Sequence, residues 1–257
     1  MTAAVRAEWT KLRTLPSTGW LLVGAVGVTI AVSATVAGLF HLNAGSTVDP
    51  TKLSLTGVQI GQAVIAVLAV LATSEEYDTG MIRVTLTAIP RRPILLAAKA
   101  AILAGLTLLV GLIAVAGCLL AGRLTLPNAG IDPAHGYALV SLSHTPTLRA
   151  AAGSVLYLIL IALLSLGVAT AIRDTAASVG AVFGLLYLAP IAAQLVDDPT
   201  WRRHLEQIAP MTAGLAIQAT TNLHSKPIAP WAGLGVLAAW VIAALLAGGL
   251  LLKLRDA

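Results

Sequence analysis

The feature that most constrains this chain is a series of long apolar runs. A helix needs about 20 mostly apolar residues to cross about 30 Å of hydrocarbon. Runs of this kind lie at residues 19–40, 57–73, 94–121, 151–171, 176–196 and 231–252. Charged residues make up only 11% of the chain, against about 25% in soluble domains. The sequence therefore predicts an all-α integral membrane protein, a single transmembrane domain over residues 1–257 with six transmembrane helices.

The residues before the first run have the pattern of a helix lying on the membrane surface. At 100° per residue, three apolar side chains fall on one face and two arginines lie together on its flank. These are Val5, Trp9, Leu12, Arg6 and Arg13. Pro16 ends this pattern. We expect an amphipathic interfacial helix over residues 1–18, with a solvated basic tail as the alternative.

A second segment outside the runs lies at residues 197–230, before the last run. Its most apolar part, residues 208–220, is too short for a crossing and contains a proline. This length favours a re-entrant or interfacial element on the outer side of the membrane.

Orientation follows from the distribution of Lys and Arg. With six spans both termini share one side, and that side carries the larger share of the 16 basic residues, in the shorter loops. We therefore expect a multi-pass protein of the cell membrane with both termini and the loop 74–93 in the cytoplasm. The net charge of +5 is scattered among loops, which fits contact with membrane lipid and argues against nucleic acid.

The sequence lacks the motifs of several kinds of chemistry. No ionisable residue lies near the centre of a run, as a proton relay would require. The chain has no phosphate-loop, H-E-x-x-H or G-x-S-x-G pattern, and its histidines lack ligand spacing. We predict no catalytic, cofactor-binding or metal-binding residue. If the protein moves a solute uphill, the energy must come from another chain.

Polar and small residues inside the runs point to helix packing. Gln62, Gln194 and a few Ser and Thr residues are expected to form interhelical hydrogen bonds rather than to bind a substrate. The pairs Gly57–Gly61 and Gly180–Gly184 have the spacing of close helix contacts, although chance explains them equally well in a chain this rich in glycine.

The charged loop between the second and third runs, residues 74–93, is the most informative segment. Ile82, Leu86 and Ile89 mark one helical face, while the same stretch also alternates at the period of a strand. An isolated strand would leave backbone groups unpaired, which favours a short helix ending at Pro90. Its apolar face must rest on lipid or on a protein partner.

This loop and its surroundings resemble a known family. "EWTKLRT" before the first run, "SEEYDTGMIRVTLTAIPRR" in the loop and "AAK" after it are similar to the permease subunit of ABC exporters of the ABC type-2 class. That class includes bacterial antibiotic- and bacteriocin-export permeases of the bacitracin-resistance kind. "LEQIAPMTAGLAIQAT" and "PWAGLGVLAAW" also resemble the stretch before the family's last span. The specific part is the pattern E-Y-x-x-G-x-I-R-x-T-L-x-x-x-P-R-R, from Glu76 to Arg92.

The resemblance implies a permease that is not itself an enzyme. Residues 74–93 would be the coupling segment, which binds a separate ABC ATP-binding subunit that holds ATP and Mg. A second permease copy or a related permease would complete a homodimer or heterodimer, and the chain itself would need no cofactor. The residues implied at or beside the coupling contact are Glu76, Tyr77, Asp78, Gly80, Met81, Ile82, Arg83, Thr85, Leu86, Pro90, Arg91 and Arg92. Met81 departs from the small polar residue that is commoner there.

Two other functions stay open at this point. A membrane scaffold or sensor without transport would have the same composition and amphipathic segments, but not the ordered pattern. An intramembrane enzyme would need catalytic groups that the runs lack. The absence of charge in the spans fits a lipophilic or amphipathic cargo, and the residues lining its path are unknown.

Overall fold

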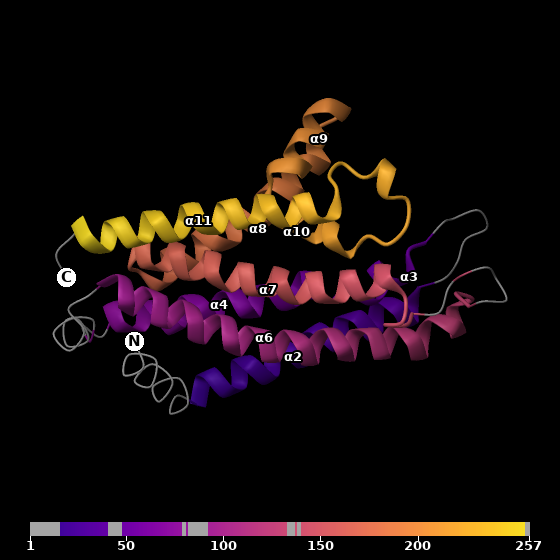
Figure 1. Cartoon of the computed structure of the whole chain (residues 1–257), viewed down its shortest axis with the longest axis horizontal. Helices are drawn as coiled ribbons and strands as arrows, with labels where there is room; N and C mark the ends of the chain where they lie inside the picture. Colours follow the sequence, from indigo (N-terminus) through magenta and orange to yellow (C-terminus); the bar gives the residue numbers. More distant parts are fainter. Residues whose placement is uncertain are drawn as a thin grey trace.

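The described chain is a bundle of helices. The computed structural model describes residues 16–40, 48–78, 81, 92–132, 137 and 140–254. Within these residues there is no strand, and six helices are long and apolar enough to cross a membrane. They are α2 (Pro16–Leu39), α4 (Val58–Asp78), α6 (Arg92–Thr125), α7 (Thr145–Ile172), α8 (Thr175–Leu195) and α11 (Pro230–Leu254) (Figure 1). The predicted all-α multi-pass membrane protein is confirmed at this level.

Successive long helices run in opposite directions. The start of α2 and the end of α11 lie at one end of the bundle, here called the proximal end (Figure 1). The ends of α4 and α7 and the starts of α6 and α8 lie there too, and the opposite end is called distal. The first and the last long helix thus have their outer ends at the same end of the bundle, while the sides of the two termini stay a prediction. Which side of the membrane the proximal end faces stays a prediction.

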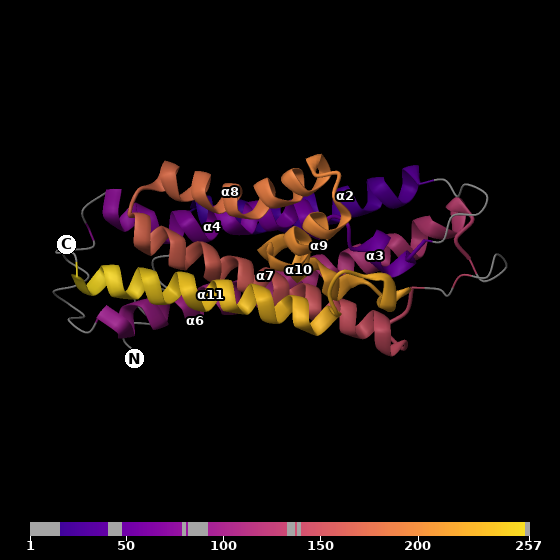
Figure 2. The same ribbon diagram turned by 90° about the horizontal axis from the view of Figure 1, so that it is seen from above.

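Helix α7 is the centre of the bundle. It packs along α11, α4, α6 and α8, and its buried side chains include Tyr157, Ile161 and Leu164. Figure 2 shows it in the middle, with α8 on one side and α11 on the other. The outer helices leave large apolar side chains exposed, such as Leu188 and Leu246. A surface of this kind is stable against lipid rather than water.

One of the two glycine pairs makes a close helix contact. A Cβ atom placed on Gly57 would lie 1.9 Å from the Thr29 carbonyl oxygen, and one placed on Gly61 would lie 1.9 Å from Thr29 Oγ1. Helices α4 and α2 therefore approach as closely as they do because these positions lack side chains. Around Gly180 nothing lies within 4 Å, and Gly184 faces only a side chain of its own helix. The second pair makes no such contact.

The segment between α8 and α11 folds into short elements at the distal half. Helix α9 (Pro199–Ile208) projects from the bundle, and α10 (Pro210–Leu215) turns back into it (Figure 1). Helix α10 is buried against α11, and η3 (Ala216–Gln218) packs on α7. The predicted short element at residues 208–220 thus contains two helical pieces, and its depth relative to a membrane stays a prediction.

Two boundaries near the proximal end differ from the sequence estimates. Helix α4 continues to Asp78, so the first part of the loop 74–93 is helical. Helix α2 already begins at Pro16, which suits a first helical turn, so residues 16–18 belong to α2. The five residues of the predicted interfacial helix, Val5, Arg6, Trp9, Leu12 and Arg13, lie outside the described part.

Candidate functional site

The predicted coupling residues fall into two groups. Seven of them lie outside the described residues: Gly80, Ile82, Arg83, Thr85, Leu86, Pro90 and Arg91. Glu76, Tyr77 and Asp78 form the end of α4, although the Asp78 side chain is not described. Met81 is exposed, and Arg92 begins α6. The structure therefore shows how the segment 79–91 is attached at both of its ends.

The first attachment is a buried ion pair between α4 and α6. Lys99 Nζ lies 2.7 Å from Glu76 Oε1, and the two side chains are 7% and 2% exposed. Lys99 lies about two helical turns after Arg92, inside the packed part of α6. Removing one partner of such a pair leaves a poorly compensated charge in a dry environment. The pair therefore fixes the two helices that enter and leave the segment.

The second attachment joins α4 to the link between α7 and α8. Arg173 ends α7 in the left-handed conformation, with φ 66°, and its N–H donates to the Ala169 carbonyl at 2.9 Å. This conformation places its guanidinium carbon 5.4 Å from the centre of the Tyr77 ring, a cation–π distance. Thr175 Oγ1 adds a hydrogen bond of 2.7 Å to Ser74 Oγ.

The third attachment involves the last turn of α11. Arg92 Nη1 donates to the Leu252 carbonyl and, at 3.4 Å, to the Lys253 carbonyl. Arg173 Nη2 donates to the Leu251 carbonyl at 3.1 Å. The last carbonyls of a helix have no partners within the helix and carry partial negative charge. Two guanidinium groups therefore cap the C-terminus of α11 and draw it to the ends of α4, α6 and α7.

We call the five residues that make these contacts the anchor cluster: Glu76, Tyr77, Arg92, Lys99 and Arg173. It links four long helices at the proximal end and includes residues on either side of the segment 79–91. Sequence reasoning identified Glu76, Tyr77 and Arg92 but missed Lys99 and Arg173. A usable signal was present for Lys99, because it and Glu76 have opposite charges just inside two consecutive antiparallel spans.

A polar contact in the middle of the bundle confirms the interhelical hydrogen bonds predicted for Gln62, whereas Gln194 is exposed near the end of α8. Tyr157 Oη donates to Gln62 Oε1, and Gln62 Nε2 donates to Tyr187 Oη at 3.2 Å. Tyr187 Oη in turn donates to the Gln59 carbonyl at 3.0 Å. These bonds join α4, α7 and α8. Gln62 and Tyr157 are fully buried, and their hydrogen bonds hold these helices together.

The described part of the chain holds no group of three or more His, Cys, Asp and Glu residues placed to bind a metal ion. Its single cysteine, Cys118, is buried and free. No family model matches the chain, and no curated protein matches it.

Proposed function

We propose that the chain is the membrane-spanning permease subunit of an ATP-driven ABC exporter of the ABC type-2 class. The observation that carries the proposal is the pattern from Glu76 to Arg92, which lies between two spanning helices whose adjoining ends are held by the anchor cluster. Such contacts would carry a movement of the segment into the bundle.

The anchor cluster gives the segment 79–91 a route to the rest of the bundle. A displacement of the segment moves the end of α4 and the start of α6, which the Glu76–Lys99 pair holds together. Arg173 connects that movement to α7, and Arg92 and Arg173 connect it to α11. A partner shifts a conformational equilibrium only through different contacts in the two states. The ATP-binding subunit would therefore pack differently on the segment before and after nucleotide binding.

The remaining components follow from the same proposal. ATP and Mg would be held by the separate ATP-binding subunit, because the chain has no phosphate loop. A second permease copy or a relative would complete the path. The exposed apolar side chains of the outer helices are available for lipid and for such a copy.

The test is co-purification with the ATPase expected to be encoded beside this chain. The two proteins are co-expressed, the permease is purified through a tag, and ATP hydrolysis is measured. Arg83→Glu and Gly80→Pro should abolish recovery of the ATPase while membrane insertion persists. Arg123→Glu is the matched control, because Arg123 is an exposed arginine at the distal end of α6.

A second variant separates binding from transmission. Arg173→Gln removes the guanidinium from Tyr77 and α11 but leaves the segment 79–91 unchanged. We expect the ATPase still to co-purify, with its hydrolysis rate no longer altered by the permease. If the wild-type chain inserts normally and recovers no ATPase, the scaffold or sensor function replaces the proposal.

A further inference from the structure

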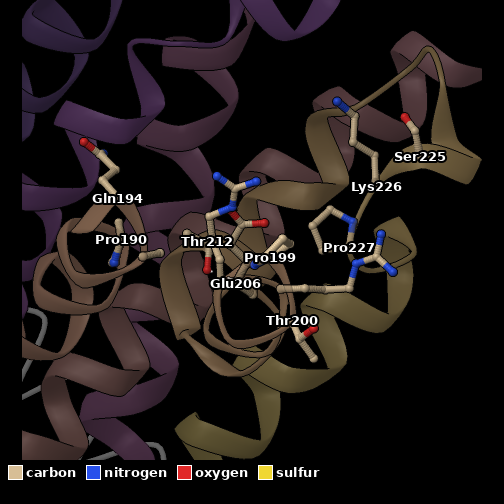
Figure 3. Close-up of a pocket in the computed structure, with 12 residues that line it drawn as sticks. Pro190, Gln194, Pro199, Thr200, Glu206, Thr212, Ser225, Lys226 and Pro227 are labelled. Atoms are coloured by element: carbon tan, nitrogen blue, oxygen red, sulfur yellow. Dashed lines mark hydrogen bonds between the residues drawn. The ribbon is translucent and has the colours of Figure 1, made fainter. Parts of the chain in front are cut away.

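The distal half of the bundle contains a cleft that is separate from the anchor cluster. One hollow of about 900 Å³ lies between α8, α9 and the loop before α11. An adjoining hollow of about 580 Å³ reaches α3 (Pro50–Ser54) and the start of α4. They share lining residues, namely Pro190, Gln194, Glu206, Thr212, Lys226 and Pro227. Figure 3 shows Gln194 and Pro190 on one side, Lys226 and Ser225 on the other, and Glu206 and Thr212 between them.

The charged lining of this cleft is mostly basic. Its lining contains four basic side chains, Lys52, Arg202, Arg203 and Lys226, and one acidic side chain, Glu206. They come from α3, from α9 and from the loop after η4 (Leu223–Ser225). Arg202 and Arg203 line the first hollow, Lys52 lines the second, and Lys226 lines both. The fold thus brings cations from three separate elements to two adjoining hollows, and such a surface attracts anions.

The backbone segments that bear Lys52 and Lys226 are joined through Asp49. Asp49 accepts hydrogen bonds from Thr220 N, Thr220 Oγ1 and Thr221 N at 2.5–3.0 Å, and also caps α3 through Lys52 N at 3.1 Å. This clamp fixes the α3 turn, which bears Lys52, to the loop that leads to Lys226. The pKa of Lys52 is lowered by burial and by the nearby ammonium of Lys226, while Asp49 and Glu206 oppose the shift. Burial is the larger cause of the shift, and a bound anion would favour the charged form of Lys52.

The other wall of the cleft is fixed as well. Gln207 Nε2 donates to the Pro227 carbonyl at 2.7 Å, which ties α9 to the loop bearing Lys226. Thr212 Oγ1 donates to the Glu206 carbonyl at 2.9 Å, which ties α10 to α9. A site whose walls are set in advance loses little entropy when a ligand binds.

The second hollow adds apolar side chains to these cations. Ile60, Ile191, Met211, Leu215 and Ile228 line it. Ile60 and Ile191 lie on spanning helices α4 and α8 and are 47% and 54% exposed. The apolar floor therefore continues to the outer surface of the bundle, where lipid chains would lie. An inorganic anion would make no use of this floor.

We propose that this cleft binds an amphiphile with an anionic, phosphate-type headgroup. The ammonium groups of Lys52 and Lys226 and the α9 arginines hold the headgroup, and its alkyl chain lies along Ile60 and Ile191. Arginine and lysine are the usual partners of phosphate oxygens. Glu206 opposes the headgroup and limits its affinity. The site does not depend on the transport proposal, and the amphiphile has two sources: a membrane phospholipid or a dissolved amphiphile.

The test uses the purified chain in a non-ionic detergent, with bound ligand counted by native mass spectrometry. The probes are phosphatidylglycerol, phosphatidylcholine, dodecyl phosphate and inorganic phosphate. We expect the anionic amphiphiles to bind about tenfold more tightly than phosphatidylcholine, and the double variant Lys52→Gln/Lys226→Gln to lose about that factor. Arg123→Gln, which removes an exposed arginine outside the cleft, should bind as the wild type does.

Glu206→Gln gives a result that damage to the fold would not produce. Removing this carboxylate should tighten binding of phosphatidylglycerol several-fold, the opposite sign to the lysine variants, and it tests the site even if the double variant fails to fold. Binding of phosphatidylglycerol indicates a membrane source, and binding of dodecyl phosphate alone indicates a dissolved one. Equal binding by wild type and the lysine variants, weaker binding by Glu206→Gln, or inorganic phosphate binding as tightly as dodecyl phosphate would overturn the assignment.

Discussion

Replacement of Lys99 by methionine should strongly destabilise the proximal end of the bundle. At an effective dielectric constant of about 20, two unit charges 2.7 Å apart attract by about 6 kcal/mol. Desolvation of the two groups offsets most of that gain, so the intact pair contributes little. Without Lys99, however, the Glu76 carboxylate, which is 2% exposed, keeps its desolvation cost and loses its contact at 2.7 Å. We expect Lys99→Met to lower the free energy of unfolding by about 3–5 kcal/mol.

The measurement is reversible unfolding in mixed detergent micelles, followed by circular dichroism. Glu76→Leu/Lys99→Met removes both charges and should recover the wild-type stability or exceed it, because no buried charge then remains at the pair. Lys253→Met is the control, since Lys253 is an exposed lysine at the same end. The reasoning is refuted if Lys99→Met lies within about 0.5 kcal/mol of the wild type, or if the double variant is as unstable as the single one.

Three further predictions concern other parts of the bundle. Gly61→Leu places a side chain where a Cβ would already lie 1.9 Å from Thr29, so it should lower thermal stability by about 2 kcal/mol or more. Gly180→Leu is the control and should change stability little, and equal effects of the two variants would contradict the close contact. Tyr157→Phe removes the donor to a fully buried amide and should cost about 1–3 kcal/mol in chemical unfolding; an unchanged midpoint would show that this bond contributes nothing. Because burial and a neighbouring ammonium lower the pKa of Lys52 in the folded protein, protonation of this group costs stability at neutral pH and the cost disappears above its unfolded pKa. Lys52→Gln should therefore raise the melting temperature at pH 7 and not at alkaline pH. A lower melting temperature at pH 7 would contradict the inference that charged Lys52 destabilises the fold.

The two proposed sites lie at opposite ends of helix α4. Helix α4 begins beside the distal cleft, with Ile60 in its lining, and ends at Glu76 and Tyr77 in the anchor cluster. A ligand in the cleft and a partner on the segment 79–91 would therefore both act on α4, and each would influence the binding of the other.

Much of the candidate site was accessible from sequence because it is local. Glu76, Tyr77 and Arg92 belong to one continuous pattern next to two spans. Lys99 and Arg173 were missed because their roles depend on neighbours far away in the chain. The cation–π contact to Tyr77 requires the left-handed end of α7, and the caps on α11 join residues about 80 and 160 positions apart.

The sequence by itself determined the six apolar helices, their alternating direction and the absence of ionisable groups near their centres. These properties follow from length and composition, since any backbone in hydrocarbon must satisfy its own hydrogen bonds. The tertiary structure alone decided that α7 is central, that Gly57–Gly61 but not Gly180–Gly184 makes a close contact, and that Lys52 and Lys226 share a cleft. The helices are apolar on every side, and lipid is as apolar as a helix face, so hydrophobicity gives no information about which faces meet. Shape and a few polar contacts determine which helix faces pack together.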